Sequence, residues 1–206
     1  MKIEPASRKI AILLSGRGSN FSAIADRIES GELDAEIALV LSNRESAPGL
    51  ENARRRGLDT LFIPSKDTSR QEFDTKAVAA LHEKDVSIVC LAGFMRILGP
   101  VFLRAFPCAI LNIHPSLLPA FPGLDVQQQA LEHGAKFSGC TVHFVDESLD
   151  GGPIIHQAVV PILDVDSVED LSIRILDQEH QIYSEAIDLV LSGRCEIAGR
   201  RVLIHD

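Results

Sequence analysis

Short apolar runs alternate with amphipathic segments over the first two thirds of the chain. Residues 9–14 form an apolar run, and a glycine-containing turn separates it from a helical spacing at residues 21–25. A strand, a glycine turn and a helix are the opening unit of a parallel α/β sheet. The unit repeats, with predicted strands at 37–41, 60–63, 86–91 and 109–113 and predicted helices at 50–56, 71–83, 101–106 and 126–132.

The pattern changes beyond Gly139. Two strand-like runs, 140–145 and 153–160, are joined by a polar segment typical of a hairpin connection. A long helix is predicted over 168–191, with Ser167 as N-cap and Gly193 as stop signal, and a short strand over 201–204 follows. We therefore expect a single α/β domain over residues 1–206: a Rossmann-like, mostly parallel twisted sheet with helices on both faces and an antiparallel C-terminal addition.

Composition narrows the class of protein. With 206 residues, 46% of them hydrophobic, the chain can bury a sizeable core without metals or disulfides. The net charge of -9 argues against nucleic acid as a partner. The four cysteines lack metal-ligand spacing, so we expect free thiols in a reducing compartment and no metal site. Neither a signal peptide nor an apolar run of about 20 residues is found, which predicts a cytoplasmic protein without a membrane span.

The most informative stretch is residues 108–123, where an apolar strand delivers Asn112 and His114 two positions apart. Residues i and i+2 of a strand point to the same face. Pro115, Pro119 and Pro122 follow and stiffen the next segment. An amide N–H stabilises a developing oxyanion and an imidazole moves protons, so the pair suits acyl transfer; a structural histidine is the alternative. Since no serine or cysteine occupies a nucleophile elbow, the nucleophile should belong to a substrate.

Two loops are candidates to complete the site. Gly16 to Asn20 precedes a predicted helix N-terminus, where free N–H groups attract an anion. The loop lacks the third glycine of a dinucleotide fingerprint and the lysine of a Walker A loop, so it suits one phosphate or is simply a tight turn. Asp146, Glu147 and Asp150 precede two glycines that would let the backbone fold close to a ligand. A carboxylate there would favour an imidazolium at His114; a solvated turn is the alternative.

Five motifs together resemble the phosphoribosylglycinamide formyltransferase family, the folate-dependent formyltransferases of purine synthesis, and they cover nearly the whole chain in order. The motifs are Ser-Gly-Arg-Gly-Ser-Asn (15–20), Leu-Ala-Gly-Phe-Met-Arg-Ile-Leu (91–98), Leu-Asn-Ile-His-Pro-Ser-Leu-Leu-Pro (111–119), Val-His-Phe-Val (142–145) and Leu-Asp-Gly-Gly-Pro (149–153). The chain departs from several relatives at residues 125–128, where they carry histidine and basic residues. The resemblance implies the formyltransferase fold and transfer of a formyl group from 10-formyltetrahydrofolate, as co-substrate, to the amine of phosphoribosylglycinamide.

The resemblance also implies a set of site residues. Asn112 would polarise the formyl oxygen, His114 would move a proton, and Asp150 would keep His114 charged. The positions implied for the phosphoribosyl substrate are Gly18, Ser19, Asn20 and Phe21 at the phosphate and Leu176, Asp177, Gln178 and Glu179 at the ribose. Those implied for the folate are Arg70, Met95, Arg96, Ile97, Leu98, Asn112, Val145, Asp146, Glu147, Ser148, Leu149 and Asp150.

Two other functions stay open at this point. A hydrolase would release formate from the same folate with water as nucleophile, and a non-catalytic phosphometabolite sensor would need only the glycine loop. The chain is expected to be a monomer or homodimer. The bend after His114 and the resemblance also make Leu118-Pro119 a candidate cis peptide bond.

Overall fold

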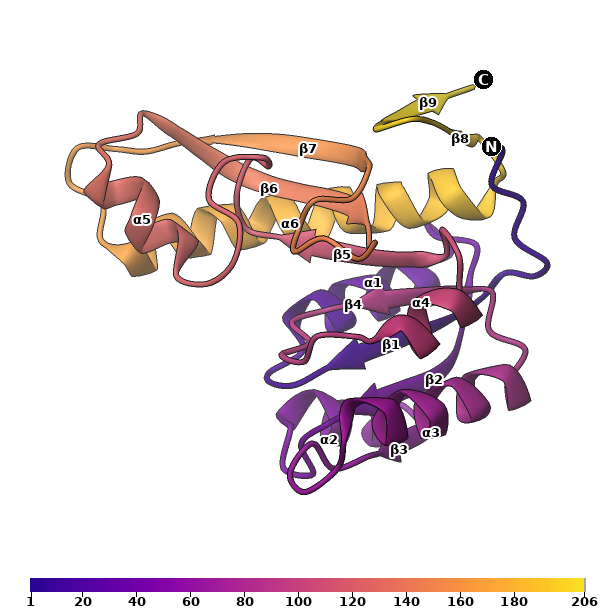
Figure 1. The fold of residues 1–206 in the computed structure, drawn as a ribbon. Helices are drawn as coiled ribbons and strands as arrows, with labels where there is room; N and C mark the ends of the chain where they lie inside the picture. Colours follow the sequence, from indigo (N-terminus) through magenta and orange to yellow (C-terminus); the bar gives the residue numbers. More distant parts are fainter. Residues whose placement is uncertain (206) are drawn as a thin grey trace.

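The computed structural model describes residues 1–205, in which one nine-stranded sheet has the strand order β3-β2-β1-β4-β5-β6-β7-β9-β8 (Figure 1). The strands are β1 (Lys9–Leu14), β2 (Glu36–Ser42), β3 (Thr60–Phe62), β4 (Ile88–Leu91), β5 (Ile110–His114), β6 (Phe137–Phe144), β7 (Ile154–Pro161), β8 (Cys195–Ala198) and β9 (Arg201–Ile204). The helices are α1 (Ser19–Glu29), α2 (Pro48–Arg55), α3 (Arg70–Glu83), α4 (Pro100–Ala105), α5 (Val126–Glu132) and α6 (Val168–Leu191).

The first five strands are parallel, as the alternating pattern predicts. The chain runs outward from β1 to β3 and then returns to add β4 and β5 on the other side of β1. One apolar core packs α1, α2 and α6 on one face of the sheet, and a second packs α3 and α4 on the other. The order reverses between β1 and β4, and open α/β sheets commonly bind ligands at such a switch point, beyond the carboxyl ends of the strands.

The second half of the sheet is mostly antiparallel; its one parallel pair is Ile154 of β7 with Arg201 of β9. β6 pairs with β5 and then with β7, and α6 lies along β6 and β7 (Figure 1). Ser167 caps α6 in a capping box with Asp170, and Gly193 follows the helix with φ +71°, so both predicted end signals are confirmed. The hydroxyl of buried Tyr183 donates to the carbonyls of Leu91 and Leu111, which fixes α6 against β4 and β5.

The sequence pattern missed β8. In place of one closing strand the chain ends in a β8–β9 hairpin, which joins the rest of the sheet through the pair Ile154 and Arg201. β8 has only four residues, of which one is buried, two are half-buried and one is exposed, and so it carries no clear periodic signal. The start of the chain lies along it: Ile3 N–H donates to the Cys195 carbonyl and Ile197 N–H to the Met1 carbonyl. The first residues of the chain therefore lie beside the β8–β9 hairpin (Figure 1).

Two smaller predictions are also confirmed. The Leu118-Pro119 peptide bond is cis. All four cysteines are free thiols, and burial raises the pKa of Cys140 to about 12 and that of Cys195 to about 11. Within residues 1–205, no helix combines the length and the apolar character that crossing a membrane requires.

Candidate active site

Asn112 and His114 lie at the end of β5, next to β6. The antiparallel register places Asn112 opposite His143 and His114 opposite Thr141, so these four side chains share one face of the sheet. The face continues into the loop after β5, because Thr141 Oγ1 donates to the Ser116 carbonyl at 2.7 Å and accepts from Leu118 N–H at 3.1 Å. The proline segment is thus held by buried hydrogen bonds, as well as by its restricted φ angles.

His114 is buried between the proline loop and Asp150. Its Nε2 lies 2.9 Å from the Phe121 carbonyl oxygen and its Nδ1 lies 3.6 Å from Asp150 Oδ2. A carbonyl oxygen only accepts, so Nε2 carries a proton and Nδ1 is the nitrogen that faces the carboxylate. Asp150 Oδ2 also accepts from Gly123 N–H at 2.9 Å. The structure therefore brings Asp150 to His114 across 36 residues of sequence.

His143 completes this cluster, and sequence reasoning gave it no role. Its Nδ1 lies 2.9 Å from the Phe144 carbonyl oxygen, so Nδ1 carries the proton and Nε2 accepts. The Asn112 amide nitrogen lies 3.2 Å from that Nε2. Burial lowers the pKa of His143 and favours this neutral form. His143 thereby orients the Asn112 amide and leaves its second N–H available for a ligand oxygen.

The glycine loop ends at the start of α1. The N-cap residue, Gly18, has φ +74° and offers no side-chain cap, so the first N–H groups of α1 are open to an anion. A Cβ on Gly18 would lie 2.9 Å from the Cα of Gly49, so α2 packs directly against the loop. Both the positive φ of Gly18 and the close approach of α2 therefore require glycine at this position.

The Asn20 side chain has a hydrogen-bond partner within the protein. Its amide nitrogen donates at 2.7 Å to Glu179 of α6, and both side chains are buried. The predicted phosphate position and the predicted ribose position are thereby joined, and the Asn20 side chain is oriented toward the carboxylate. Burial raises the pKa of Glu179, while the bond from Asn20 lowers it.

The predicted folate positions include exposed apolar side chains. Met95, Ile97 and Leu149 are each at least 60% exposed, whereas Leu98 is buried. Arg70 is exposed at the first residue of α3. The guanidinium of Arg96 instead turns inward, donating to the carbonyls of Ser65 and Thr68 and lying 4.6 Å from the Phe73 ring centre.

The acidic loop between β6 and β7 is internally hydrogen-bonded. Ser148 N–H and hydroxyl both bond to the Asp146 carboxylate. A Cβ on Gly152 would overlap the Phe144 carbonyl oxygen, and one on Gly151 would overlap the Ser148 hydroxyl. The two glycines therefore allow close approach within the protein, and the predicted approach to a ligand stays a prediction. That packing holds Asp150, which has φ +49°, against the end of β5.

Comparison with known proteins agrees with the family that the sequence motifs resemble. Residues 8–187 match the family described as formyl transferase. The chain is 43% identical to phosphoribosylglycinamide formyltransferase of Escherichia coli K12, over 91% of this chain and 89% of that protein. It resembles the crystal structure of glycinamide ribonucleotide transformylase 1 from Symbiobacterium toebii with a TM-score of 0.94 and 53% identity, covering 96% of this chain and 94% of the other.

A third relative is much longer than this chain. The trifunctional purine biosynthetic protein adenosine-3 of Drosophila pseudoobscura pseudoobscura is 48% identical over 90% of this chain. The chain spans 14% of that protein's length, and 14–20% across the trifunctional relatives as a group. On these matches, the chain belongs to the formyl transferase family, in its phosphoribosylglycinamide formyltransferase branch.

Proposed function

We propose that this protein transfers the formyl group of 10-formyltetrahydrofolate to the amine of phosphoribosylglycinamide. The observation that carries the proposal is the buried cluster in which neutral His143 orients the Asn112 amide while Asp150 faces His114 Nδ1. An oriented amide donor and a carboxylate-paired imidazole suit acyl transfer to an external nucleophile. Membership of the family supplies the folate as co-substrate.

The reaction assigned to the cluster exchanges one C–N bond for another and moves one proton from the amine to the folate nitrogen. The substrate amine attacks the formyl carbon, and a new C–N bond forms while the bond between that carbon and the folate nitrogen breaks. The free N–H of Asn112 stabilises the negative charge that develops on the formyl oxygen. A proton leaves the amine and one reaches the folate nitrogen, with His114 Nδ1 and the Asp150 carboxylate as the groups that carry it.

The substrate ends are assigned to the surrounding loops. The open N–H groups of Gly18, Ser19, Asn20 and Phe21 bind the phosphate, and the turn of α6 from 176 to 179 meets the ribose. Glu179 and Tyr183 lie one helical turn apart, and the Tyr183 hydroxyl contacts the carbonyl of Leu111, the residue before Asn112. The phosphate and ribose positions are therefore linked to the catalytic strand through α6.

The folate is assigned to residues 95–98 and 145–150. Their exposed apolar side chains fit the flat face of a pterin, and backbone groups read its polar edge. Arg70, exposed and cationic, is the residue we assign to the glutamate tail. Because the guanidinium of Arg96 points inward, we assign Arg96 to supporting the conformation of this loop and not to contact with the folate.

One assay tests the proposal: loss of the formyl group from 10-formyltetrahydrofolate is followed with and without phosphoribosylglycinamide. We expect loss only when the amine is present, with one formylated product per folate consumed. Equal loss without the amine would identify a hydrolase, and no loss under either condition would leave a phosphometabolite sensor.

A further inference from the structure

A closed set of hydrogen bonds joins the loops that follow β1, β2, β3 and β4. Ser15 Oγ accepts from Met95 N–H at 2.8 Å and donates to Asn43 Oδ1 at 2.6 Å. Asn43 Nδ2 donates to Ser65 Oγ at 2.8 Å. The Ser65 carbonyl accepts from Arg96 at 3.2 Å, and Arg96 is the neighbour of Met95, so the path closes. We call these five residues the loop ring.

Asn43 is the centre of the loop ring because both its amide oxygen and its amide nitrogen form hydrogen bonds within the ring. It follows β2, which lies between β1 and β3, and it bonds to the loop after each of them. Asn43 and Ser15 are buried, 6% and 3% exposed. A buried polar group that loses its partner is costly, so a movement of one loop alone is opposed by the others.

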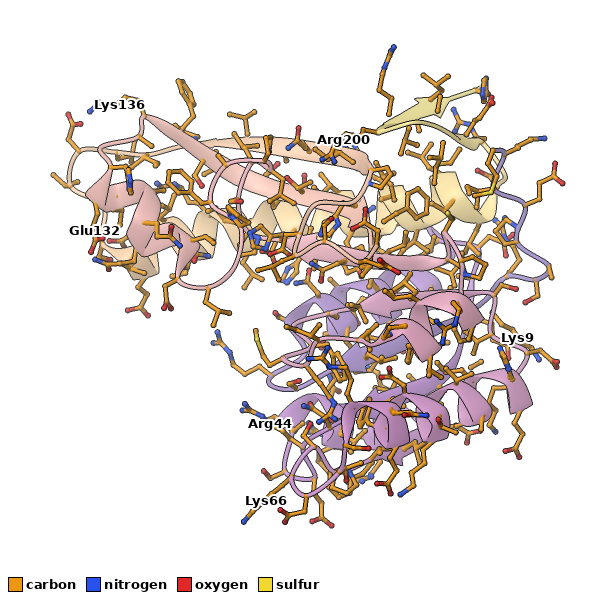
Figure 2. The ribbon with its side chains drawn as sticks, viewed as in Figure 1. Lys9, Arg44, Lys66, Glu132, Lys136 and Arg200 are labelled. Carbon is orange, nitrogen blue, oxygen red and sulfur yellow. The ribbon has the colours of Figure 1, made fainter. Side chains whose placement is uncertain are left out.

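Arg96 anchors the loop ring on the side of β4. Besides Ser65 it bonds to the Thr68 carbonyl at 3.0 Å, and it lies over the Phe73 ring of α3. Arg44 and Lys66, the exposed sequence neighbours of Asn43 and Ser65, point away from the molecule in Figure 2. The side chains of Arg44 and Lys66 thus face solvent, and the only charged member of the loop ring is Arg96, which is hydrogen-bonded to backbone carbonyls.

The loop ring connects two segments to which the proposed function gives different ligands. Ser15 leads directly into Gly16 and the phosphate loop, while Met95 and Arg96 begin the folate loop. A second backbone bond, from Ser15 N–H to the Gly93 carbonyl at 3.1 Å, fixes the same pair of loops. A ligand that orders one loop therefore also orders the other, and the second ligand loses less conformational entropy on binding.

On the basis of the proposed function, we propose that Asn43 is a positioning residue that couples the binding of the two substrates. It touches neither ligand and acts through Ser15 on the phosphate loop and through Ser65 and Arg96 on the folate loop. The coupling is reciprocal, since each ligand must raise the affinity of the other by the same factor.

The test measures coupling with a pair of ligands that cannot react. Binding of phosphoribosylglycinamide is followed by calorimetry with and without saturating tetrahydrofolate. We expect at least about fivefold tighter binding with the folate in the unaltered protein, and a coupling factor near 1 in Asn43→Ala. In steady state, KM for both substrates should rise about tenfold while kcat stays within roughly threefold, because the ring contacts no reacting atom.

Three further variants separate coupling from a general loss of folding. Ser65→Ala breaks the same bond from a half-buried position and should lower the coupling factor as Asn43→Ala does. The double variant should be no worse than Asn43→Ala alone. Asn52→Ala, which removes a 2.9 Å bond from α2 to Ser22, is the matched asparagine control and should retain coupling.

The outcomes are distinguishable. Coupling that survives in both Asn43→Ala and Ser65→Ala, or that is absent from the unaltered protein although both ligands bind, would overturn the role of Asn43. Equal loss in Asn52→Ala would also overturn it. Failure of the unaltered protein to bind either ligand would instead remove the proposed function, and the coupling with it.

Discussion

The amide of Asn20 donates a 2.7 Å hydrogen bond to the carboxylate of Glu179, a residue 159 positions away. The bond joins the first turn of α1 to the middle of α6 on the side of the sheet where the phosphate and ribose are assigned. Burial favours the protonated form of Glu179, and the donated bond favours the charged form. The balance between them makes this pair sensitive to pH and to substitution.

Replacing Asn20 should therefore destabilise the protein. Asn20→Ala leaves a buried carboxylate without its donor, and we expect a loss of about 1–3 kcal/mol in the free energy of unfolding. Urea unfolding at pH 7 measures it, and Asn52→Ala provides the partly exposed asparagine control. A loss no greater than that of the control would contradict a stabilising bond.

The pH dependence of stability should change in Glu179→Gln. The pKa of Glu179 is raised in the folded state, so its stabilisation is complete below the unfolded value near 4.5 and is lost as pH rises through the folded pKa. The glutamine variant lacks this titration and still accepts from Asn20. Urea unfolding between pH 4.5 and 8 should show the unaltered protein losing stability relative to the variant as pH rises; parallel curves would show that Glu179 does not titrate in that range.

Asn112 and Asp150, two of the three residues assigned to catalysis, should be needed for turnover but not for folding. Asn112→Ala removes the oxyanion donor and should lower kcat about 10²–10³-fold. Asp150→Asn removes the charge beside His114 and should lower kcat about 10²–10⁴-fold. Formyl transfer is measured beside thermal unfolding, with exposed Asp59→Asn as the carboxylate control; near-normal kcat in either site variant removes that residue's assigned role.

His143 should act through Asn112. His143→Leu removes the acceptor that orients the amide, and we expect kcat to fall about tenfold or more, by less than in Asn112→Ala. His143→Gln keeps an acceptor and should recover part of the loss. If His143→Leu and His143→Gln lower kcat equally, His143 does not act by orienting the Asn112 amide.

The titration of His143 provides an independent measurement. Its folded pKa lies below the ordinary value of 6.5, so its contribution to stability is complete above 6.5 and is lost as pH falls through the folded pKa. Protonation also places an N–H on Nε2 against the Asn112 donor. We expect the unaltered protein to lose stability relative to His143→Leu below pH 6.5, with an acid limb in its kcat profile that the variant lacks.

Close backbone packing at Gly152 should be essential for placing Asp150. A Cβ in Gly152→Ala would overlap the Phe144 carbonyl oxygen, and overpacking of this kind costs about 1–3 kcal/mol. We expect lower stability together with lower kcat. Gly199→Ala is the control, because that glycine has φ +64° but open space around it, so its cost is backbone strain without loss of kcat.

The fold was predictable where local signals agree. Ser167 and Gly193 mark the ends of α6 because a capping residue and a left-handed glycine act on their own neighbours. Apolar runs of four to six residues predicted β1 to β5 because buried parallel strands have few polar positions. β8 carries no such signal, since its order depends on pairing with β9 and with the first residues of the chain.

The site was less predictable because its contacts are remote in sequence. The cluster of Asn112, His114 and Asp150, predicted from motifs, does come together. The bond of Asn20 to Glu179 and the inward turn of Arg96 depend on how α6 and α3 pack, which no local pattern reports. His143 lies in an apolar strand and resembles a core histidine. Its place in the site follows only from the strand register that pairs it with Asn112.

The pairing of Met1 and Ile3 with β8 has a consequence for self-association. An edge strand with open N–H and C=O groups is a template for strands of other molecules and thus for aggregation. Here the chain's own first residues occupy the outer edge of β8, and β3 at the opposite edge has only three residues. Deleting the first three residues should expose β8, and the truncated protein should aggregate faster on mild heating than the full chain.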